Sequence, residues 1–328
     1  MDTRTLGKTD LEVSPIGLGC WQFSQGKNMT GRMWSVLDQG TMDAVVAAAL
    51  DGGVTWFDTA QAYGNGASER ALSAALQHRG VEPGRVVIAT KWLPIAKPAG
   101  DIARTIGTRI ACLQPYPIDL FQVHSPGSLA SIPAQMREMA KLVRAGKVRA
   151  IGVSNFSAKQ MAQAAAALKD EGLVLATNQV RINLLERRVE SNGVLAAARG
   201  LGVTLIAYSP LAQGILTGRY HDDPAAARAL PWGRRSRLSP SSRFLTPEGL
   251  RRTEPLITEL RAVGEAHGAT AAQVALAWLV THYGDTVVAI PGASRAEQAT
   301  AAAAAGDLRL TDAEMAGVDE ISAAIARR

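Results

Sequence analysis

Short apolar segments alternate with amphipathic or alanine-rich segments along nearly the whole chain. Eight apolar segments of strand length lie at residues 16–18, 54–57, 86–90, 118–123, 149–153, 175–180, 203–207 and 286–290. Segments with helical character lie between and after them, at residues 42–50, 68–77, 102–113, 133–144, 157–168, 194–199, 271–280 and 296–305. Strands that are apolar throughout are typical of parallel sheets covered by helices, so this rhythm predicts a single α/β domain, a (β/α)8 barrel, over residues 1–328.

Two features depart from the rhythm. A short hairpin is predicted before the first strand, with extended segments at 3–6 and 11–13 joined by a turn at 7–10. Long loops are predicted after the first and seventh strands, at 22–39 and 210–253. Loops of this length inside a compact domain are usually functional.

The amino-acid composition indicates a globular protein. Hydrophobic residues make up 47% and charged residues 20% of the chain, which suits a globular protein with a large core. Charges interrupt the first twenty residues and no apolar run is long enough to span a membrane, so we expect a cytoplasmic protein. Cys20 and Cys112 are far apart and lack metal-like spacing, so neither a disulfide framework nor a metal site is predicted.

The net charge of +6 does not indicate nucleic acid as a partner. Basic residues are scattered among acidic ones and few aromatic residues accompany them, which favours a small anionic ligand. The one tight basic cluster is Arg234, Arg235 and Arg237, in the second long loop. Two interpretations stay open for it, a solvated loop and a loop that contacts phosphate.

Ionisable residues stand where three neighbouring apolar segments end. Asp58 follows the second segment, Lys91 the third and His124 the fourth, while Tyr63 lies in the loop after Asp58. Active sites of (β/α)8 barrels lie at the carboxyl ends of the strands, so these four residues would face one mouth. Each has a structural alternative: a backbone acceptor, a solvent-exposed amine, a satisfied buried histidine and a packed ring. Three neighbouring strands that each end in an ionisable residue favour the catalytic interpretation.

These four residue types suit the reduction of a carbonyl group. A Lys91 ammonium near Tyr63 would lower the tyrosine pKa from about 10, and Asp58 would keep the lysine charged and oriented. Tyr63 would then serve as general acid, while His124 would polarise the carbonyl oxygen. Because no side chain supplies a hydride, we expect a nicotinamide cofactor.

The GxGxxG fingerprint of dinucleotide-binding sheets does not follow any predicted strand. Barrels instead tend to bind phosphate with the loops after strands seven and eight. Those places carry YSPLAQGILTG at residues 208–218 and IPGASRAEQ at residues 290–298, and a helix N-terminus follows Ser294. Both segments are therefore predicted to bind the phosphates of the cofactor.

Taken together, these segments resemble the aldo-keto reductase family. The similarity runs essentially end to end, through RTLGKTDLEVSPIGLG, FDTAQAYGNGASE, ATKW, DLFQVH, AIGVSNFS, TNQV, YSPLAQGILTG and IPGASRAEQ. The resemblance implies an NADPH-dependent oxidoreductase that reduces an aldehyde or ketone. It also implies a catalytic tetrad of Asp58, Tyr63, Lys91 and His124.

The resemblance further implies a set of cofactor contacts. The matching positions are Ser154, Asn155 and Gln179 for the nicotinamide carboxamide, Tyr208 for stacking on the ring, Ser209, Leu211, Gln213 and Gly214 for the pyrophosphate, and Ser294 and Arg295, with Gln298 beside them, for the adenosine 2′-phosphate. A 2′-phosphate site implies NADPH over NADH. The chain departs from many members at Ala301 and Ala302, where those members carry a glutamate and an asparagine that bind the adenine amine.

Four apolar residues near the predicted mouth, Trp21, Phe23, Met33 and Trp34, are candidates for substrate contact, with core or loop packing as the alternative. They would favour aldehydes with hydrophobic or aromatic bodies. Glu69, beside Ser68 at a predicted helix start, is interpreted as structural.

Two other functions stay open. Lys91 could form a Schiff base in an aldolase, although Asp58 argues against this because a neighbouring carboxylate keeps a lysine charged. One branch of the family resembles potassium-channel beta subunits and binds NADPH mainly as a regulatory or redox-sensing partner, a role compatible with an intact tetrad. The natural substrate, the direction of reaction and the oligomeric state are not predicted.

Overall fold

A closed barrel of parallel strands forms the centre of the molecule. The computed structural model describes residues 1–26, 34–230 and 241–326. Its main sheet has eight strands that pair in chain order, namely β3 (Leu18–Gly19), β4 (Trp56–Asp58), β5 (Val87–Trp92), β6 (Leu120–Val123), β7 (Ala150–Ser154), β8 (Leu175–Arg181), β9 (Thr204–Tyr208) and β10 (Val287–Ile290). Backbone bridges from Ile16 to Ala289 and from Gly19 to Gly292 bring the first strand beside the last. Every predicted strand overlaps one of these, which confirms the (β/α)8 barrel.

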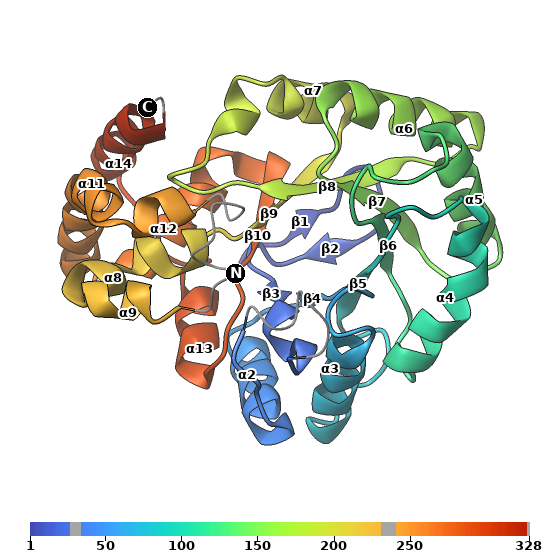
Figure 1. Cartoon of the computed structure of the whole chain (residues 1–328), viewed down its shortest axis with the longest axis horizontal. Coiled ribbons are helices and arrows are strands. Elements are labelled where there is room, and N and C mark those ends of the chain that lie inside the picture. The colour runs from blue at the N-terminus through green and yellow to red at the C-terminus, as the bar shows by residue number, and fades with distance from the viewer. Residues whose placement is uncertain (27–33, 231–240, 327–328) are drawn as a thin grey trace.

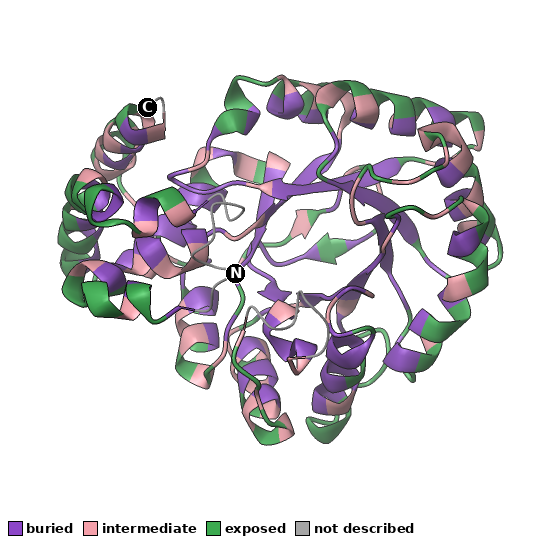
Figure 2. Ribbon diagram, viewed as in Figure 1, coloured by how far each residue is buried: buried purple, intermediate pink, exposed green. Residues whose placement is uncertain are grey.

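Helices surround the barrel on its outside (Figure 1). Those predicted from the sequence are α2 (Gln39–Asp51), α3 (Ala67–His78), α4 (Gly100–Leu113), α5 (Ile132–Arg144), α6 (Ala158–Asp170), α7 (Val194–Leu201), α12 (Ala271–His282) and α13 (Ala296–Ala304). Several begin at a side-chain cap that satisfies a free backbone N–H; Ser157 and Thr270, for example, form capping boxes with Gln160 and Gln273. The barrel strands are buried except for Val87, Arg181 and Tyr208, which are partly exposed at strand ends, whereas the outer faces of the helices are exposed (Figure 2).

Two long helices are missed by the sequence interpretation. These are α11 (Pro247–Ala266) and α14 (Asp312–Ala326), which pack against each other and against α12. Pro255 lies inside α11 and is normally a helix breaker, but the buried residues Leu256, Ile257 and Leu260 of the same helix contribute to the core. Tertiary packing therefore outweighs the local signal.

The two predicted long loops contain short helices. The first begins with η1 (Trp21–Ser24). The second contains η3 (Ala212–Thr217), α8 (Arg219–Asp222), α9 (Pro224–Arg228), η4 (Ser242–Leu245) and the start of α11. The cluster of Arg234, Arg235 and Arg237 lies outside the described residues, so both interpretations of it remain predictions.

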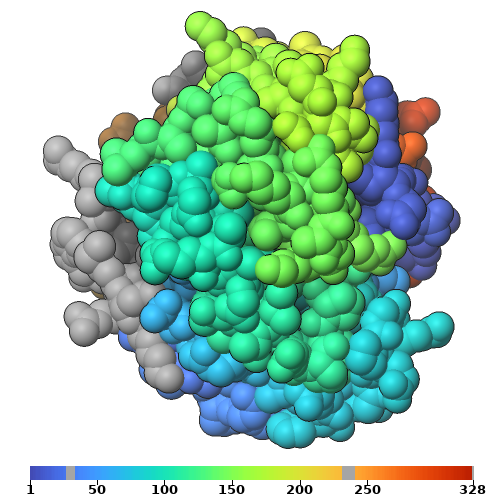
Figure 3. Space-filling model, turned by 90° about the vertical axis from the view of Figure 1, so that its right-hand side faces the viewer, coloured from blue at the N-terminus to red at the C-terminus, as the bar shows by residue number. Residues whose placement is uncertain are grey.

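The predicted N-terminal hairpin is present and closes the amino end of the barrel. Strands β1 (Arg4–Thr5) and β2 (Glu12–Val13) pair antiparallel. Leu6, Leu11 and Val13 are buried in one cluster with residues from the barrel strands, including Trp56 and Ile206. In a side view the N-terminal segment lies at one end of the wall formed by the outer helices (Figure 3).

Candidate active site

A cavity of about 1010 Å³ opens among the carboxyl ends of the strands. Three of the four predicted catalytic residues line it, namely Asp58, Tyr63 and His124, while Lys91 lies directly beneath. The predicted cofactor residues also line it: Ser154, Asn155, Gln179, Tyr208, Ser209, Leu211, Gln213, Gly214, Ser294, Arg295 and Gln298. The structure thus brings together residues that span more than half of the sequence.

Lys91 is completely buried and has a hydrogen-bond acceptor for each of its protons. Its Nζ forms an ion pair with Oδ1 of Asp58, donates to the carbonyl oxygen of Thr59 at 2.9 Å and donates to the Tyr63 hydroxyl at 3.5 Å. A lysine ammonium carries three donors and no acceptor. Tyr63 therefore accepts from Lys91, which leaves the proton of its own hydroxyl free to point into the cavity. Burial lowers the pKa of Lys91, and Asp58 opposes that shift.

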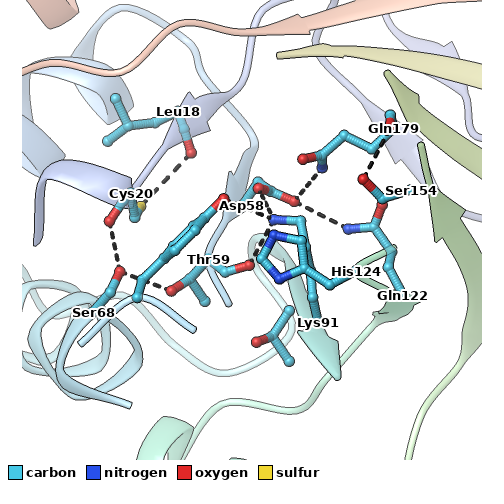
Figure 4. Close-up of polar contacts among 12 residues, drawn as sticks. Leu18, Cys20, Asp58, Thr59, Ser68, Lys91, Gln122, His124, Ser154 and Gln179 are labelled. Carbon is cyan, nitrogen blue, oxygen red and sulfur yellow. Dashed lines mark hydrogen bonds and ion pairs between the residues drawn. The ribbon is translucent and has the colours of Figure 1, made fainter. Parts of the chain in front are cut away.

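Asp58 holds the centre of this network at the end of β4. Two side-chain amides donate to its Oδ2, Gln179 at 2.8 Å and Gln122 at 3.1 Å, opposite the ion pair with Lys91 (Figure 4). The Asp58 side chain is 1% exposed. A buried carboxylate is costly unless it is paired and hydrogen-bonded, and here three donors meet that requirement.

Tyr63 is positioned by a turn that contains Gly64, Asn65 and Gly66. All three have positive φ values, of 68°, 53° and 87°. A Cβ at Gly64 would lie 2.3 Å from the carbonyl oxygen of Ser24, so glycine is needed for both the backbone conformation and the close approach. The stretch YGNG therefore directs the chain back so that Tyr63 faces Lys91.

The direction of the Tyr63 pKa differs from the sequence prediction. Burial raises this pKa well above 10.0, and the negative charge of Asp58 raises it further. The expected lowering of the pKa by Lys91 is wrong because the ammonium is 3.5 Å away and is already paired with Asp58, while burial of the phenol disfavours its charged form. Tyr63 is therefore a neutral phenol across the physiological range.

His124 follows β6 and faces Tyr63 across the cavity. The two rings meet edge to face with centroids 5.7 Å apart. Burial lowers the pKa of His124 to about 3, and the positive charge of Lys91 adds to the shift. The imidazole is therefore neutral near pH 7 and carries a single N–H. Its Nδ1 is buried and has no hydrogen-bond partner among the described residues.

Glu69, which is predicted to be structural, and Ser68 beside it lie behind the predicted catalytic residues at the start of α3. The Ser68 hydroxyl donates to the carbonyl oxygen of Cys20 at 2.6 Å and lies 2.8 Å from the Thr59 hydroxyl. Glu69 accepts from the Thr90 hydroxyl at 2.6 Å and forms a buried ion pair with Arg109. Thr59 and Thr90 are the neighbours of Asp58 and Lys91 in the chain, so these contacts hold both strand ends.

Polar residues at the ends of β7, β8 and β9 form a second part of the cavity wall. The Tyr208 hydroxyl donates to Oδ1 of Asn155 at 3.0 Å, and Asn155 Nδ2 donates to the Ser154 hydroxyl at 3.0 Å. The Ser154 hydroxyl donates to the backbone carbonyl of Gln179 at 2.9 Å. Asn155 has a φ of 61°, a backbone conformation that a non-glycine residue adopts mostly at constrained, often functional positions.

The segment after β9 has unusual backbone geometry. Ser209, Ala212, Gln213 and Gly214 have φ values of 51°, 48°, 58° and 93°. Left-handed residues beside right-handed ones can turn successive N–H groups toward one concave side, which is a common way to bind anions. The guanidinium of Arg219 lies beside this segment, with Nε 3.7 Å from the position of a Cβ on Gly214.

The N-terminus of α13 borders the far end of the cavity. Gln298 Oε1 accepts from the Ser294 N–H at 2.9 Å and lies 3.2 Å from the Ser294 hydroxyl. Arg295 precedes the helix and its side chain is 71% exposed. Ala301 and Ala302, one turn further along, also line the cavity.

Aromatic residues line the end of the cavity that holds Tyr63 and His124. Trp21 stacks on Tyr63 with ring centroids 5.7 Å apart, and Trp34 meets Trp21 edge to face at 5.7 Å. Both tryptophans line the cavity, but Phe23 is completely buried in the main core and does not. The substrate prediction is therefore wrong for Phe23, because the turn of η1 directs its ring into the protein. Met33 lies outside the described residues.

The residues missed by the sequence interpretation include three polar ones at or beside the cavity. Arg181 and Arg219 line the cavity, and Gln122 is a buried residue that donates to Asp58. Alternation along a strand could have found two of them, because Gln122 lies two residues before His124 and Arg181 two residues after Gln179 on the same faces. Arg219 directly follows the first predicted phosphate-binding segment, residues 208–218, and had no comparable signal.

Two negative findings apply to residues 1–26, 34–230 and 241–326. No cluster of three histidine, cysteine, aspartate or glutamate residues there could hold a metal ion. None of the helices in these ranges combines the length and apolar character needed to cross a membrane.

The sequence of this chain is similar to those of known proteins over most of its length. The model of the aldo/keto reductase family matches residues 15–323. An uncharacterized oxidoreductase of Mycobacterium tuberculosis is 38% identical over 305 residues, which cover 92% of this chain and 86% of that protein. The chloroplastic pyridoxal reductase of Arabidopsis thaliana is 33% identical over 294 residues, which cover 86% of this chain and 76% of that protein.

Among solved structures, the glycerol dehydrogenase of Gluconobacter oxydans is similar over nearly its whole length. It has a TM-score of 0.82 and 28% sequence identity, and the match covers 100% of this chain and 97% of that one.

Proposed function

The chain belongs to the aldo/keto reductase family of oxidoreductases, and from this premise we propose that it reduces an aldehyde or ketone to an alcohol with NADPH, with Tyr63 as the proton donor. One observation carries the proposal. Lys91 donates to the Tyr63 hydroxyl, to Asp58 and to the carbonyl of Thr59, so the phenolic proton of Tyr63 is left for a ligand in the cavity.

The raised pKa of Tyr63 supports the direction of reduction. A proton donor must carry its proton before the reaction, and burial keeps Tyr63 protonated at neutral pH. As Tyr63 gives up that proton, the ammonium of Lys91 stabilises the phenolate that forms, because it already donates to the same oxygen. Asp58 holds the ammonium in place from the other side.

Neutral His124 orients the carbonyl group beside Tyr63. Its ring lies edge to face with the tyrosine ring at the cavity wall, and a neutral imidazole can donate one hydrogen bond to the carbonyl oxygen. Trp21 and Trp34 line the same end of the cavity. These walls favour substrates with an aromatic or otherwise hydrophobic body.

The rest of the cavity suits a dinucleotide. When bound, the reduced nicotinamide supplies the hydride that no side chain can supply. The Gln179 side chain donates to Asp58 through Nε2. Its side-chain oxygen Oε1 is therefore available to accept from the carboxamide amine, next to Ser154 and Asn155. Tyr208 offers a ring for stacking, and the left-handed segment after β9 offers backbone N–H groups for the diphosphate.

The preference for NADPH over NADH rests on the N-terminus of α13. Arg295 and Ser294 precede this helix at the cavity wall, where a guanidinium, a hydroxyl and the helix dipole favour a phosphate monoester. Gln298 bonds to Ser294 and fixes its side chain and backbone.

The geometry disfavours the aldolase alternative. A Schiff base requires an accessible lysine amine, but Lys91 is buried beneath the cavity and all of its protons are engaged. Although burial lowers its pKa, a substrate carbonyl could reach Nζ only by displacing Tyr63 or Asp58.

The experiment is to mix the protein with NADPH and 4-nitrobenzaldehyde, follow nicotinamide absorbance and identify the product. Loss of NADPH with an equal amount of 4-nitrobenzyl alcohol supports the proposal. Tight NADPH binding without turnover of this or other carbonyls contradicts reduction and favours the regulatory role. Borohydride trapping of substrate carbon on Lys91 would instead support the aldolase.

A further inference from the structure

We propose that Arg181 binds an anionic group of the carbonyl substrate, so that the preferred substrates are aldehydes or ketones that also carry a carboxylate or a phosphate. The inference deepens the proposed function and rests on it. No residue assigned above to catalysis or to the cofactor provides such a contact.

Arg181 is the last residue of β8 and lines the cavity. It lies two residues after Gln179, and side chains two apart on a strand point to the same face. In the barrel it pairs in register with Tyr208, and its guanidinium carbon is 5.2 Å from the centre of the Tyr208 ring. The side chain is thus held over the ring expected to stack on the nicotinamide.

The charge of Arg181 is not neutralised by the protein. Within the described ranges its side chain makes one long hydrogen bond, to the Ser241 hydroxyl at 3.4 Å, and no ion pair. Residues 27–33 and 231–240 contain no aspartate or glutamate, so the remaining loop segments cannot supply a carboxylate. The acidic residues that line the cavity are Asp58, which is paired with Lys91, and Glu297, which lies 4.0 Å from Arg295.

Two other arginines lie nearer than Arg181 to the proposed positions of the cofactor phosphates. Arg295 adjoins Ser294 at the proposed 2′-phosphate site, and Arg219 lies beside Gly214 in the proposed diphosphate segment. Arg181 lies at neither place but beside Tyr208, at the nicotinamide end. An unpaired guanidinium at this end suits an anion that arrives with the substrate, and a planar guanidinium matches a carboxylate or a phosphate with two hydrogen bonds.

The distance between Arg181 and the reacting end of the cavity matches the length of a small molecule. Gln179 contacts Asp58 directly, and the Cα of Arg181 lies about 7 Å further along the strand. An aromatic ring separates a carbonyl from a para substituent by a comparable distance. We therefore choose 4-carboxybenzaldehyde as probe and the methyl ester of the same acid, methyl 4-formylbenzoate, as its neutral counterpart.

The first measurement is kcat/KM for these two aldehydes with the wild type and with Arg181→Met, Arg181→Lys and Arg85→Met. Arg85 is an exposed arginine just before β5, at the opposite end of the barrel, so its variant controls for the loss of one positive charge. We expect the wild type to prefer the carboxylate, Arg181→Met to lose about tenfold to a hundredfold of that preference, and Arg181→Lys to retain part of it. Arg85→Met should behave as the wild type.

The second measurement separates the substrate from the cofactor. The NADPH dissociation constant from fluorescence titration should be unchanged in Arg181→Met. Weaker NADPH binding with an unchanged preference between the aldehydes would overturn the inference and assign Arg181 to the diphosphate. No preference for the carboxylate in the wild type would overturn it as well.

A third measurement distinguishes failure of the inference from failure of the proposed function. If no aldehyde is reduced, calorimetric binding of 4-(hydroxymethyl)benzoate to the NADP⁺-loaded protein still tests Arg181. Binding that Arg181→Met abolishes supports an anion site in a protein that is not a reductase of this probe. Equal binding of this acid and its methyl ester contradicts the inference, whatever the turnover.

Discussion

The two ends of the cavity are built by different means. The proposed catalytic end, formed by Asp58, Tyr63, Lys91 and His124, consists of side chains on or next to strand ends. Its ion pair is almost wholly buried, with exposed fractions of 0% for Lys91 and 1% for Asp58. The proposed phosphate end, formed by the segment after β9 and the start of α13, consists of left-handed backbone and of Arg295, whose side chain is 71% exposed.

The difference shows how each end tolerates change. At the proposed catalytic end the buried Lys91 ammonium and Asp58 carboxylate neutralise each other, so removal of one partner leaves the other as an unpaired buried charge. At the phosphate end the groups face solvent until a ligand arrives, so removal of one cation affects binding and leaves the fold intact. Substitutions at the two ends should therefore differ in kind as well as in size.

The largest effect is expected for Lys91→Met, which removes the ammonium and keeps the shape of the side chain. The free energy of unfolding should fall by roughly 3–5 kcal/mol, because the Asp58 carboxylate remains buried without its partner. Turnover should fall at least a hundredfold, because the phenolate of Tyr63 loses its stabilising charge. Urea denaturation and NADPH oxidation measure the two effects.

The matched control is the double variant Asp58→Asn with Lys91→Met. It removes both charges, so it should recover much of the lost stability while turnover stays low. Equal destabilisation in the single and double variants would contradict the account of a mutually dependent pair.

A smaller effect is expected for Arg295→Ala. NADPH affinity should fall about tenfold, the low end for a hydrogen bond to a charged group, because the side chain is exposed. NADH affinity and the urea midpoint should not change, and Arg85→Ala serves as the control for overall charge. A similar loss of affinity for both cofactors would show that Arg295 does not contact the 2′-phosphate.

The smallest effect concerns pH. His124 has a folded pKa of about 3, below the ordinary value of 6.5, so it stays neutral and kcat/KM should show no histidine step between pH 5 and 8. The folded protein binds fewer protons at this site than the unfolded chain, so stability from this residue is lost as pH falls from 6.5 toward 3. Acid unfolding of His124→Gln should accordingly be less steep. A step near pH 6.5 in kcat/KM that disappears in His124→Gln would contradict a buried neutral imidazole.

The same contrast explains how much of the site can be predicted from the sequence. Asp58, Lys91 and His124 end apolar strands, so the periodicity of the chain alone places them at one mouth of the barrel. Gln122 lies on the same strand face as His124, but its role depends on a contact with β4 that periodicity does not specify. The left-handed conformations of Ser209, Ala212 and Gln213 are imposed by tertiary context and have no local sequence signal.

The wrong predictions have the same origin. The nearness of Lys91 predicts a lowered Tyr63 pKa, but its direction is set by burial, which the sequence does not measure. The place of Phe23 after the first strand predicts a substrate contact, but the 3-10 turn from Trp21 to Ser24 directs it into the core. Each wrong prediction concerns the burial of a side chain, which depends on the assembled barrel.

The role of Tyr63 as proton donor is tested by the rate of hydride transfer in Tyr63→Phe and in the wild type, each saturated with NADPH and mixed with 4-nitrobenzaldehyde. We predict a rate lower by about two to four orders of magnitude and an unchanged NADPH dissociation constant, because the variant lacks only the proton that Lys91 leaves free. A rate within a few-fold of the wild type would show that another group donates the proton and would contradict the account.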